Sequence, residues 1–257
     1  MTPPTAHAAP RSRPAITLLR TELRLFGREP GALFWVMIAP TLLLVILGSI
    51  PSFREPSADY GGARVIDYYV PVAVLFALIT AGLQAMPPAL TGYRENGILR
   101  RLSTTPVRPR ALLGAQLALN GAASLVSALL VIATGRIAFD VALPGNLPGY
   151  ALALFLAASG TLALGAAVCA VSRTQKMSQA VGSAVYFPSM FTAGVWLPVQ
   201  GMPDTLRGIV EYTPCGAASR ALDAAAAGDW PAWSALGVMA LWAVLLTGAA
   251  VRWFRWE

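Results

Sequence analysis

Six long stretches of the chain contain no charged residue, and charged segments separate them. A hydrocarbon core of roughly 30 Å needs about 20 apolar helical residues, so each stretch is long enough to cross a bilayer. Because lipid cannot satisfy backbone hydrogen bonds, and because the stretches are too long for barrel strands, the pattern predicts an all-α polytopic membrane protein. The expected spans are residues 33–50, 68–90, 111–135, 147–171, 179–197 and 232–251.

The rest of the chain divides into a short arm and the parts of one membrane domain. Residues 1–14 are rich in Pro, Ala and Arg and are expected to form a disordered arm, and residues 15–257 form a single transmembrane domain. Residues 15–29 show helical periodicity, with arginines at every fourth position. An apolar face beside a basic stripe is typical of an amphipathic helix in the membrane surface. We therefore predict an N-terminal interfacial helix.

Fixed charge is distributed unequally between the two sides of the expected spans. Of the 19 Lys and Arg residues, 14 fall on the side that also holds both termini. Since cytoplasmic loops of membrane proteins carry the excess of basic residues, we expect a multi-pass protein of the cell (plasma) membrane with both termini in the cytoplasm. The basic surplus favours contact with anionic membrane lipid over binding to nucleic acid.

Residues 91–109, between the second and third expected spans, form the most informative polar segment. Pro87 and Pro88 precede it, and Pro106 and Pro109 end it. Because proline interrupts helices, we expect a short cytoplasmic helix held between two spans. Its small apolar patch with a charged rim suits a docking surface, although an ordinary basic loop has a similar composition. The candidate docking residues are Arg94, Glu95, Ile98, Leu99, Arg101 and Leu102.

Residues 198–229, between the last two expected spans, are unusually apolar for a loop in solvent. Short helices folded back into the outer leaflet would shield these side chains, so we predict outer re-entrant helices. The two cysteines are expected at different depths, with Cys169 near the cytoplasmic end of the fourth span and Cys215 in this outer segment. Disulfide geometry forbids a bridge across most of the bilayer, so both are expected to be free thiols.

The third expected span carries Gln116, Asn120 and Ser124 at helical spacing, so these polar side chains share one face. In hydrocarbon such a stripe must face another helix, a pore or a water-filled cavity, and Gln84 of the second span is a candidate partner. Two interpretations are open: helix packing, and lining of a substrate path.

Two further spans carry distinctive side chains. In the fifth, Pro188 is expected to kink the helix near Tyr186, Phe187 and Phe191. These aromatic side chains either face a lipophilic ligand or belong to a plain core or lipid-facing surface. The fourth span has a groove of small residues that permits close helix packing, formed by Ala153, Ala157, Thr161, Gly165 and Cys169.

Several chemistries are absent from the sequence. The spans contain no Asp, Glu, Lys, Arg or His, whereas an ion-driven carrier normally keeps an ionisable group or a broken-helix ion site near the midplane. His7 is the single histidine, which excludes imidazole-based triads and paired zinc-binding histidines. The chain also lacks the G-x-x-x-x-G-K-[ST] loop of P-loop ATPases. The spans carry polar residues suited to binding a ligand but no residues suited to catalysis, which indicates a transport path.

Four stretches together resemble the permease subunits of type-2 ABC exporters, and they are similar to the daunorubicin-resistance drug-export permeases. One departure is Arg100, which stands where many relatives have an acid. The stretches are Arg28-Glu29-Pro30 with Leu33-Phe34-Trp35 and Pro40; Arg94 to Leu102 with Thr105-Pro106-Val107 and Leu112 to Gln116; Ala193 to Pro198 with Met202-Pro203; and Tyr212-Thr213-Pro214 through Leu222.

The resemblance implies a non-catalytic transport subunit whose dimer forms the path of an amphipathic drug, antibiotic, lipid or glycolipid. It implies that ATP and Mg²⁺ bind to a separate cytosolic ABC-type ATPase, that this chain binds no cofactor, and that Glu95 contacts the ATPase. The predicted path residues are Gln84, Gln116, Asn120, Ser124, Tyr186, Phe187 and Phe191. The alternatives are a self-sufficient channel or secondary carrier, a membrane enzyme, and a membrane assembly scaffold.

Overall fold

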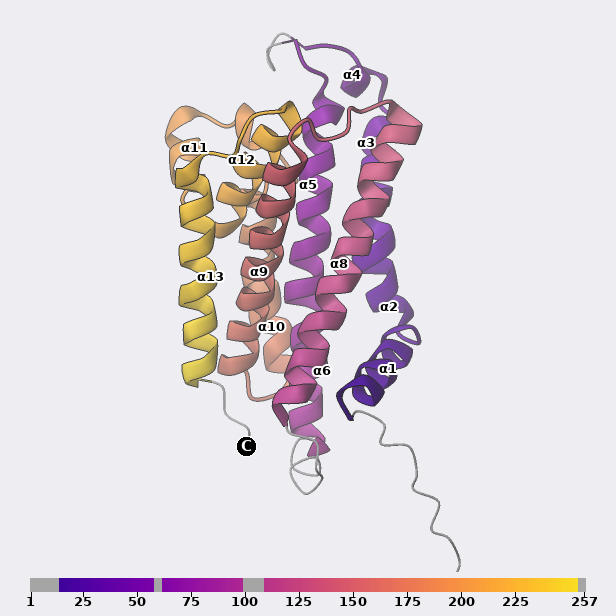
Figure 1. Cartoon of the computed structure of the whole chain (residues 1–257), viewed down its shortest axis with the longest axis vertical. Coiled ribbons are helices and arrows are strands. Elements are labelled where there is room, and N and C mark those ends of the chain that lie inside the picture. Colours follow the sequence, from indigo (N-terminus) through magenta and orange to yellow (C-terminus); the bar gives the residue numbers. More distant parts are fainter. Residues whose placement is uncertain (1–13, 58–61, 99–108, 254–257) are drawn as a thin grey trace, which may run out of the picture.

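The chain folds into a bundle of long helices. The computed structural model describes residues 14–57, 62–98 and 109–253, and within these ranges it contains helices, turns and loops but no β-strand. The long helices run side by side, and shorter helices lie at both ends of the bundle (Figure 1). The predicted all-α architecture is therefore confirmed for the described part of the chain.

Five helical segments are long and apolar enough to cross a membrane, and they correspond to five of the six predicted spans. Three of them belong to α8 (Pro109–Phe139), α9 (Leu147–Val171) and α13 (Trp233–Trp253). The other two, Pro30–Gly48 and Val65–Glu95, are each assembled from shorter helical pieces. The chain is thus a multi-pass membrane protein.

The remaining predicted span, residues 179–197, corresponds to α10 (Gln175–Thr192), which lies in the same bundle but is more polar at its start. Its first turns contain Gln175, Lys176 and Gln179. A sixth crossing of the membrane therefore stays a prediction.

The end of α10 comes earlier than the predicted end at residue 197. Gly194 has a φ of 89°. The N–H groups of Gly194 and Val195 donate to the carbonyl oxygens of Phe191 and Met190 at 3.0 and 3.1 Å. These two bonds form a Schellman motif, which needs a residue with positive φ after the helix and so ends it at glycine.

The second predicted span is one continuous helical segment, so the expectation that Pro87 and Pro88 interrupt its helix is wrong. α5 (Val65–Thr80) continues through a π-helical turn, η3 (Ala81–Ala85), into α6 (Met86–Glu95). Proline lacks the N–H group of a regular helical turn and clashes with the turn before it. The π-helical turn directly before the two prolines accommodates them, and the helix reaches Glu95.

The first span uses the same arrangement. α2 (Pro30–Leu33) continues through the π-helical turn η1 (Phe34–Ile38) into α3 (Ala39–Gly48), and Pro40 lies in the first turn of α3. The span with Pro40 and the span with Pro87 and Pro88 therefore each carry a π-helical turn.

Short helices mark the two ends of the bundle. α1 (Pro14–Phe26) packs against α8 at one end, which we call the α1 end (Figure 1). The α12 end carries α4 (Pro51–Arg54), η4 (Val199–Gly201), α11 (Asp204–Val210) and α12 (Pro214–Ala227). Helices are thus present where interfacial and outer helices were predicted, and their depth in a membrane stays a prediction.

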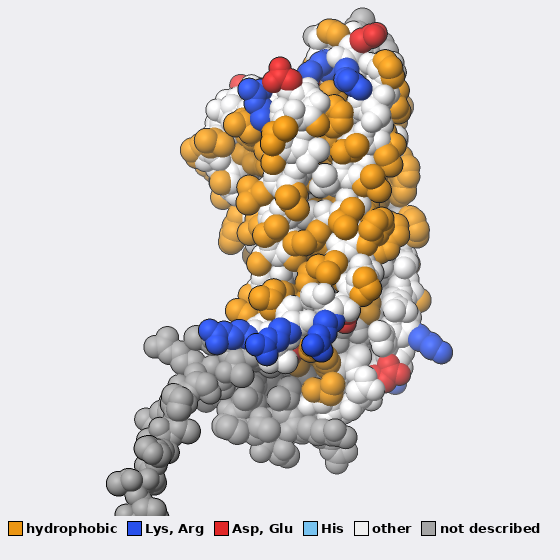
Figure 2. All heavy atoms as spheres, turned by 90° about the vertical axis from the view of Figure 1, so that its right-hand side faces the viewer, with side chains coloured by type: hydrophobic (Ala, Val, Ile, Leu, Met, Phe, Trp, Pro, Cys, Tyr) orange, Lys and Arg blue, Asp and Glu red, His pale blue; other side chains and the backbone are white. Residues whose placement is uncertain are grey.

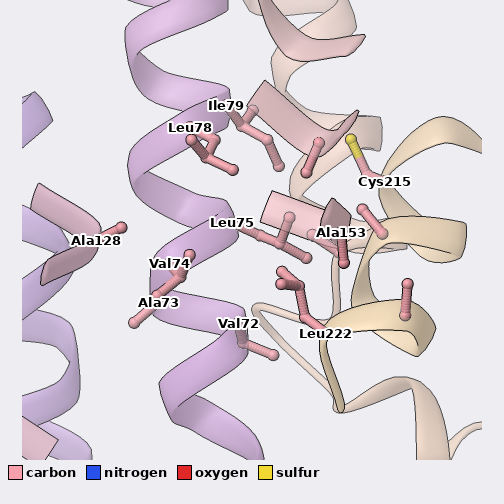
Figure 3. Close-up of a cluster of buried hydrophobic side chains, with 14 of the residues drawn as sticks. Val72, Ala73, Val74, Leu75, Leu78, Ile79, Ala128, Ala153, Cys215 and Leu222 are labelled. Atoms are coloured by element: carbon pink, nitrogen blue, oxygen red, sulfur yellow. The ribbon is translucent and has the colours of Figure 1, made fainter. Parts of the chain in front are cut away.

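The hydrophobic core surrounds α5. In the segment Val65–Glu95, 83% of the most apolar stretch is buried, against 39% or less in the other four. Ala128 of α8 lies on one side of α5, whereas Ala153 of α9 and Leu222 of α12 lie on the other (Figure 3). The α5–η3–α6 segment is therefore the central helix of the bundle.

The predicted groove of small residues brings α9 against η3. A Cβ added to Gly165 would lie 1.9 Å from the carbonyl oxygen of Gly82, and a Cβ added to Gly82 would lie 2.5 Å from that of Thr161. The two backbones are therefore in direct contact. Both cysteines are free, as predicted, and both are buried.

Hydrophobic side chains cover the middle of the bundle, whereas charged side chains gather at its two ends (Figure 2). On the face shown, a row of Lys and Arg side chains lies near the α1 end, and basic and acidic side chains mix near the α12 end. This distribution fits a protein whose middle is surrounded by hydrocarbon.

Replacing Gly165 with alanine is expected to destabilise the protein by about 1–3 kcal/mol, because the new methyl group overpacks the contact with η3. The matched control is Gly160→Ala in the same helix, where an added Cβ meets no atom within 4 Å. We expect Gly165→Ala, but not Gly160→Ala, to lower the thermal unfolding midpoint of the purified protein in detergent. Equal midpoints for the two variants would contradict the close contact.

Candidate functional site

The polar stripe of α8 is buried, and its hydrogen bonds stay largely within the helix. Gln116, Asn120 and Ser124 are all buried, as predicted for an inward face. Asn120 Nδ2 donates to the main-chain oxygen and to Oε1 of Gln116 at 2.9 and 3.1 Å. Ser124 Oγ donates to the carbonyl oxygen of Gly121 at 2.9 Å. Both interpretations, helix packing and lining of a substrate path, stay predictions.

Glu22 of α1 contacts the stripe, where Gln84 was the candidate partner. Gln116 Nε2 donates to Glu22 Oε2 at 2.5 Å, and the hydroxyl group of Tyr93 in α6 donates to the same oxygen at 2.8 Å. Glu22 is only 4% exposed. We call Glu22, Tyr93 and Gln116 the Glu22 cluster, and it joins α1, α6 and α8.

The sequence held a signal for this cluster. Glu22 precedes Phe26 by one helical turn, so the carboxylate lies on the apolar side of α1 rather than in its arginine stripe. An acid on an apolar face requires polar partners when that face is buried. A helix on the membrane surface meets lipid headgroups, so the predicted position of α1 gave Glu22 no partner in the spans.

Arg94 and Glu95, at the end of α6, bind the loop between α9 and α10. The Arg94 guanidinium group donates to the carbonyl oxygens of Ser172 and Cys169 at 2.8 and 3.3 Å. Glu95 Oε2 accepts a hydrogen bond from the main-chain N–H of Gln175 at 2.9 Å. Both residues were predicted to belong to a docking surface, and here they fasten α6 to the neighbouring helices.

The remaining candidate docking residues follow a turn after α6. Gly97 in this turn has a φ of 68°, and Ile98 directly after it is 36% exposed. Leu99, Arg101 and Leu102 lie outside the described residues. The docking surface as a whole stays a prediction.

A polar groove of about 310 Å³ lies between the first span, the α5–η3–α6 segment and α10. Val36 of η1, together with Gln84 and Ala85 of η3, places both π-helical turns in its wall. Such turns occur frequently at functional sites. We call it the polar groove. Its polar residues are Glu29, Thr80, Gln84, Gln175 and Gln179.

The predicted aromatic residues of α10 continue from the polar groove onto the protein surface. The hydroxyl oxygens of Tyr186 and Thr80 are 3.2 Å apart, so Tyr186 is joined to a residue of the groove. Phe187 is 59% exposed and stacks on Trp196, with 6.4 Å between the ring centroids. Phe191 is 37% exposed. Gln116, Asn120 and Ser124 do not line this groove.

Comparison with known protein families shows the family of the chain. A model of the ABC-2 type transporter family matches residues 15–224, which is most of the chain. The chain belongs to the ABC-2 type transporter family. It is therefore a membrane permease subunit of an ABC transporter. No curated protein matches this permease, so the similarity to daunorubicin-resistance permeases stays a prediction.

A larger cavity of the permease was not anticipated from the sequence. It has a volume of about 660 Å³ and lies between α6, α8, α9 and α13. Its lining is mainly apolar, and it includes Met86, Leu113 and Leu162. The lining comes from four different helices, so no local sequence pattern indicated the cavity, and none of the predicted site residues lines it.

Replacing Glu22 with alanine removes the oxygen that Tyr93 and Gln116 share. Because the buried Gln116 and the half-buried Tyr93 both lose their acceptor, we expect a destabilisation of about 1–3 kcal/mol. Glu22→Gln keeps a side-chain oxygen and should cost less. The measurement is the thermal unfolding midpoint in detergent, in a double-mutant cycle with Tyr93→Phe. Additive effects of Glu22→Ala and Tyr93→Phe would show that this hydrogen bond does not contribute.

Proposed function

We propose that two copies of this permease form the path of an ATP-driven exporter for an amphipathic drug, antibiotic, lipid or glycolipid. A separate cytosolic ABC-type ATPase hydrolyses ATP, and ATP and Mg²⁺ bind to that partner, with no cofactor on this chain. The observation that carries the proposal is the polar groove beside exposed aromatic side chains in a transporter membrane subunit.

The composition of the groove is an argument for a second copy of the permease at this face. Exposed aromatic side chains such as Trp35 and Phe187 can face lipid without cost. The amide groups of Gln84 and Gln179 find no hydrogen-bond partner in hydrocarbon, so a groove that contains them must face water or protein. A second copy that meets the first here encloses two polar grooves and their aromatic rims in one path.

The charge distribution supports a cytoplasmic α1 end in the cell membrane. Arginines of α1 lie at this end, together with Arg173 and Lys176 of the α9–α10 region. Acidic residues such as Asp140, Asp204 and Glu211 belong to the opposite end. Basic residues accumulate on the cytoplasmic side of membrane proteins, where they also attract anionic lipid. Both chain termini are then cytoplasmic.

The end of α6 connects the docking segment to the polar groove. An ATPase that docks on Ile98 and the residues after it moves the end of α6, where Arg94 and Glu95 hold the α9–α10 loop. Because Gln84 and Gln179 line the groove from η3 and α10, movement between these elements changes the groove. An almost complete switch requires the ATP-bound partner to favour one permease state by about 5.5 kcal/mol.

We expect Glu95→Ala and Leu102→Asp each to reduce compound-stimulated ATP hydrolysis by about tenfold in the complex of the permease with its co-purifying ATPase. A tenfold reduction corresponds to about 1.4 kcal/mol of coupling free energy. Leu102→Asp places a charge in the predicted apolar patch and should also reduce the amount of captured ATPase. Glu95→Ala should leave capture unchanged.

The control for these variants is Glu55→Ala, which removes an exposed carboxylate at the α12 end. It should retain capture and stimulated hydrolysis. Full stimulated hydrolysis by both test variants, at normal expression and membrane insertion, would remove the coupling role from the segment 91–109.

Cysteine cross-linking tests the second copy. We expect Phe187→Cys to form a cross-linked dimer with a short bis-maleimide in native membranes, because Phe187 follows Tyr186, which is joined to Thr80 of the polar groove. Phe155→Cys is the matched control, since Phe155 is 66% exposed on α9 and Phe187 is 59% exposed on α10. The two native cysteines are buried and give little background. Equal cross-linking at both positions, or none at Phe187→Cys, would place the dimer contact elsewhere.

A further inference from the structure

A cavity that contains several charged residues lies at the α12 end, far along the bundle from the polar groove. It has a volume of about 330 Å³, at the lower end of the range of small-molecule sites. Its walls come from the start of α5, from α8 and the loop after it, from α9 and from α12. We call it the Asp223 cavity. Its charged and hydroxyl-bearing residues are Arg64, Asp67, Tyr68, Asp140, Tyr150 and Asp223.

Two buried polar atoms of this cavity have no hydrogen-bond partner within the described part of the chain. They are Oδ1 of Asp223 and the hydroxyl oxygen of Tyr150. Tyr150 is only 5% exposed, so bulk solvent does not replace the missing partner. A buried polar group without a partner is costly, and two of them lining one cavity indicate a missing occupant with polar atoms.

The other charges of the cavity are already compensated. The Arg64 guanidinium group contacts both carboxylate oxygens of Asp67, at 2.6 and 3.1 Å, and donates to the carbonyl oxygens of Phe139 and Asp140. The Asp140 carboxylate pairs with Arg136 at 2.7 Å. Arg64, Asp67 and Asp140 therefore contribute little net charge to an occupant.

The Asp223 carboxylate is different, because its partners in the described residues are neutral. Its Oδ2 accepts hydrogen bonds from the Gln200 amide and, at 3.4 Å, from the Ser219 hydroxyl group. Burial raises the pKa of the Asp223 carboxyl to about 7, although these two hydrogen bonds act to lower it. A carboxylate in this position is stabilised by a cation.

We propose that the Asp223 cavity binds a protonated primary amine with a small apolar body. The ammonium group donates to Oδ1 of Asp223 and to the hydroxyl oxygen of Tyr150. The apolar body lies against Val70, Pro71 and Ile132, which belong to the same lining. An ammonium group supplies three donors and a positive charge, so it serves both unpartnered acceptors and compensates the carboxylate.

This site is independent of the proposed exporter path. The polar groove is built from the α1-end half of the bundle, whereas the Asp223 cavity is built from the start of α5 and the C-terminal part of α12. Binding of an amine here requires neither an ATPase nor a second copy. Failure of the exporter proposal therefore leaves this one standing, and the reverse also holds.

The test compares 2-phenylethylamine with its neutral counterpart 2-phenylethanol. Their binding to the purified full-length permease, with any subunit that co-purifies, is measured by isothermal titration calorimetry in lipid nanodiscs at neutral pH, with empty nanodiscs as the blank. We expect saturable binding of the amine and none of the alcohol. Equal binding of the two compounds, or no saturable binding of the amine, would overturn the proposal and leave a bridging water as the occupant.

Three variants locate the site. Asp223→Asn and Tyr150→Phe are each expected to weaken amine binding, by about tenfold or more for Asp223→Asn because it removes the charge. Tyr150→Phe removes only the hydroxyl group and keeps the ring, so it tests the site if Asp223→Asn does not fold. Asp204→Asn is the control, since Asp204 is an exposed acid at the same end that pairs with Arg207. Unchanged affinity in Tyr150→Phe and in folded Asp223→Asn would place the amine elsewhere.

Discussion

The direct contact between α9 and the π-helical turn η3 is the interaction on which the rest of the structure depends. A backbone in lipid must satisfy its own hydrogen bonds, so a span that contains Pro87 and Pro88 needs a local change of helical geometry to continue. The π-helical turn supplies that change, and the absence of side chains at Gly82 and Gly165 lets α9 pack on it. The same turn carries Gln84 into the polar groove on its other side.

Because the central segment is continuous, it connects three polar places at different heights of the bundle. The Asp223 cavity adjoins the start of α5, the polar groove adjoins η3, and the Glu22 cluster adjoins the end of α6. Tyr93 of the Glu22 cluster is the neighbour of Arg94, which binds the α9–α10 loop. A displacement of the chain after Glu95 is thus transmitted through these contacts to α1, α8 and the start of α10. This is a physical basis for coupling a docked partner to the groove.

The sequence predicted most of the fold because charge-free stretches of sufficient length have few alternatives to membrane helices. Residues 147–171 coincide with α9, and the small residues of that helix pack closely as expected. Two wrong predictions have local causes. The π-helical turn η3 lets the helix of the second span continue through its prolines, and a Schellman motif at Gly194 ends α10 earlier than predicted. Periodicity places Glu22 on the apolar side of α1, but it does not reveal its partners Tyr93 and Gln116, because they lie on other helices. The 660 Å³ cavity and the Asp223 cavity likewise depend on contacts between several helices.

The most direct measurement of the central claim is the maleimide labelling rate of Gln84→Cys in the complex of the permease with its captured ATPase. Gln84 lies in the polar groove, and an exposed position at the α12 end, Ser52→Cys, serves as the reference. If ATP binding by the partner moves α6 and reshapes the groove, a non-hydrolysable ATP analogue will change the labelling rate at Gln84→Cys but not at Ser52→Cys. Equal rates at Gln84→Cys with and without nucleotide, in a complex that binds the analogue, would contradict the account.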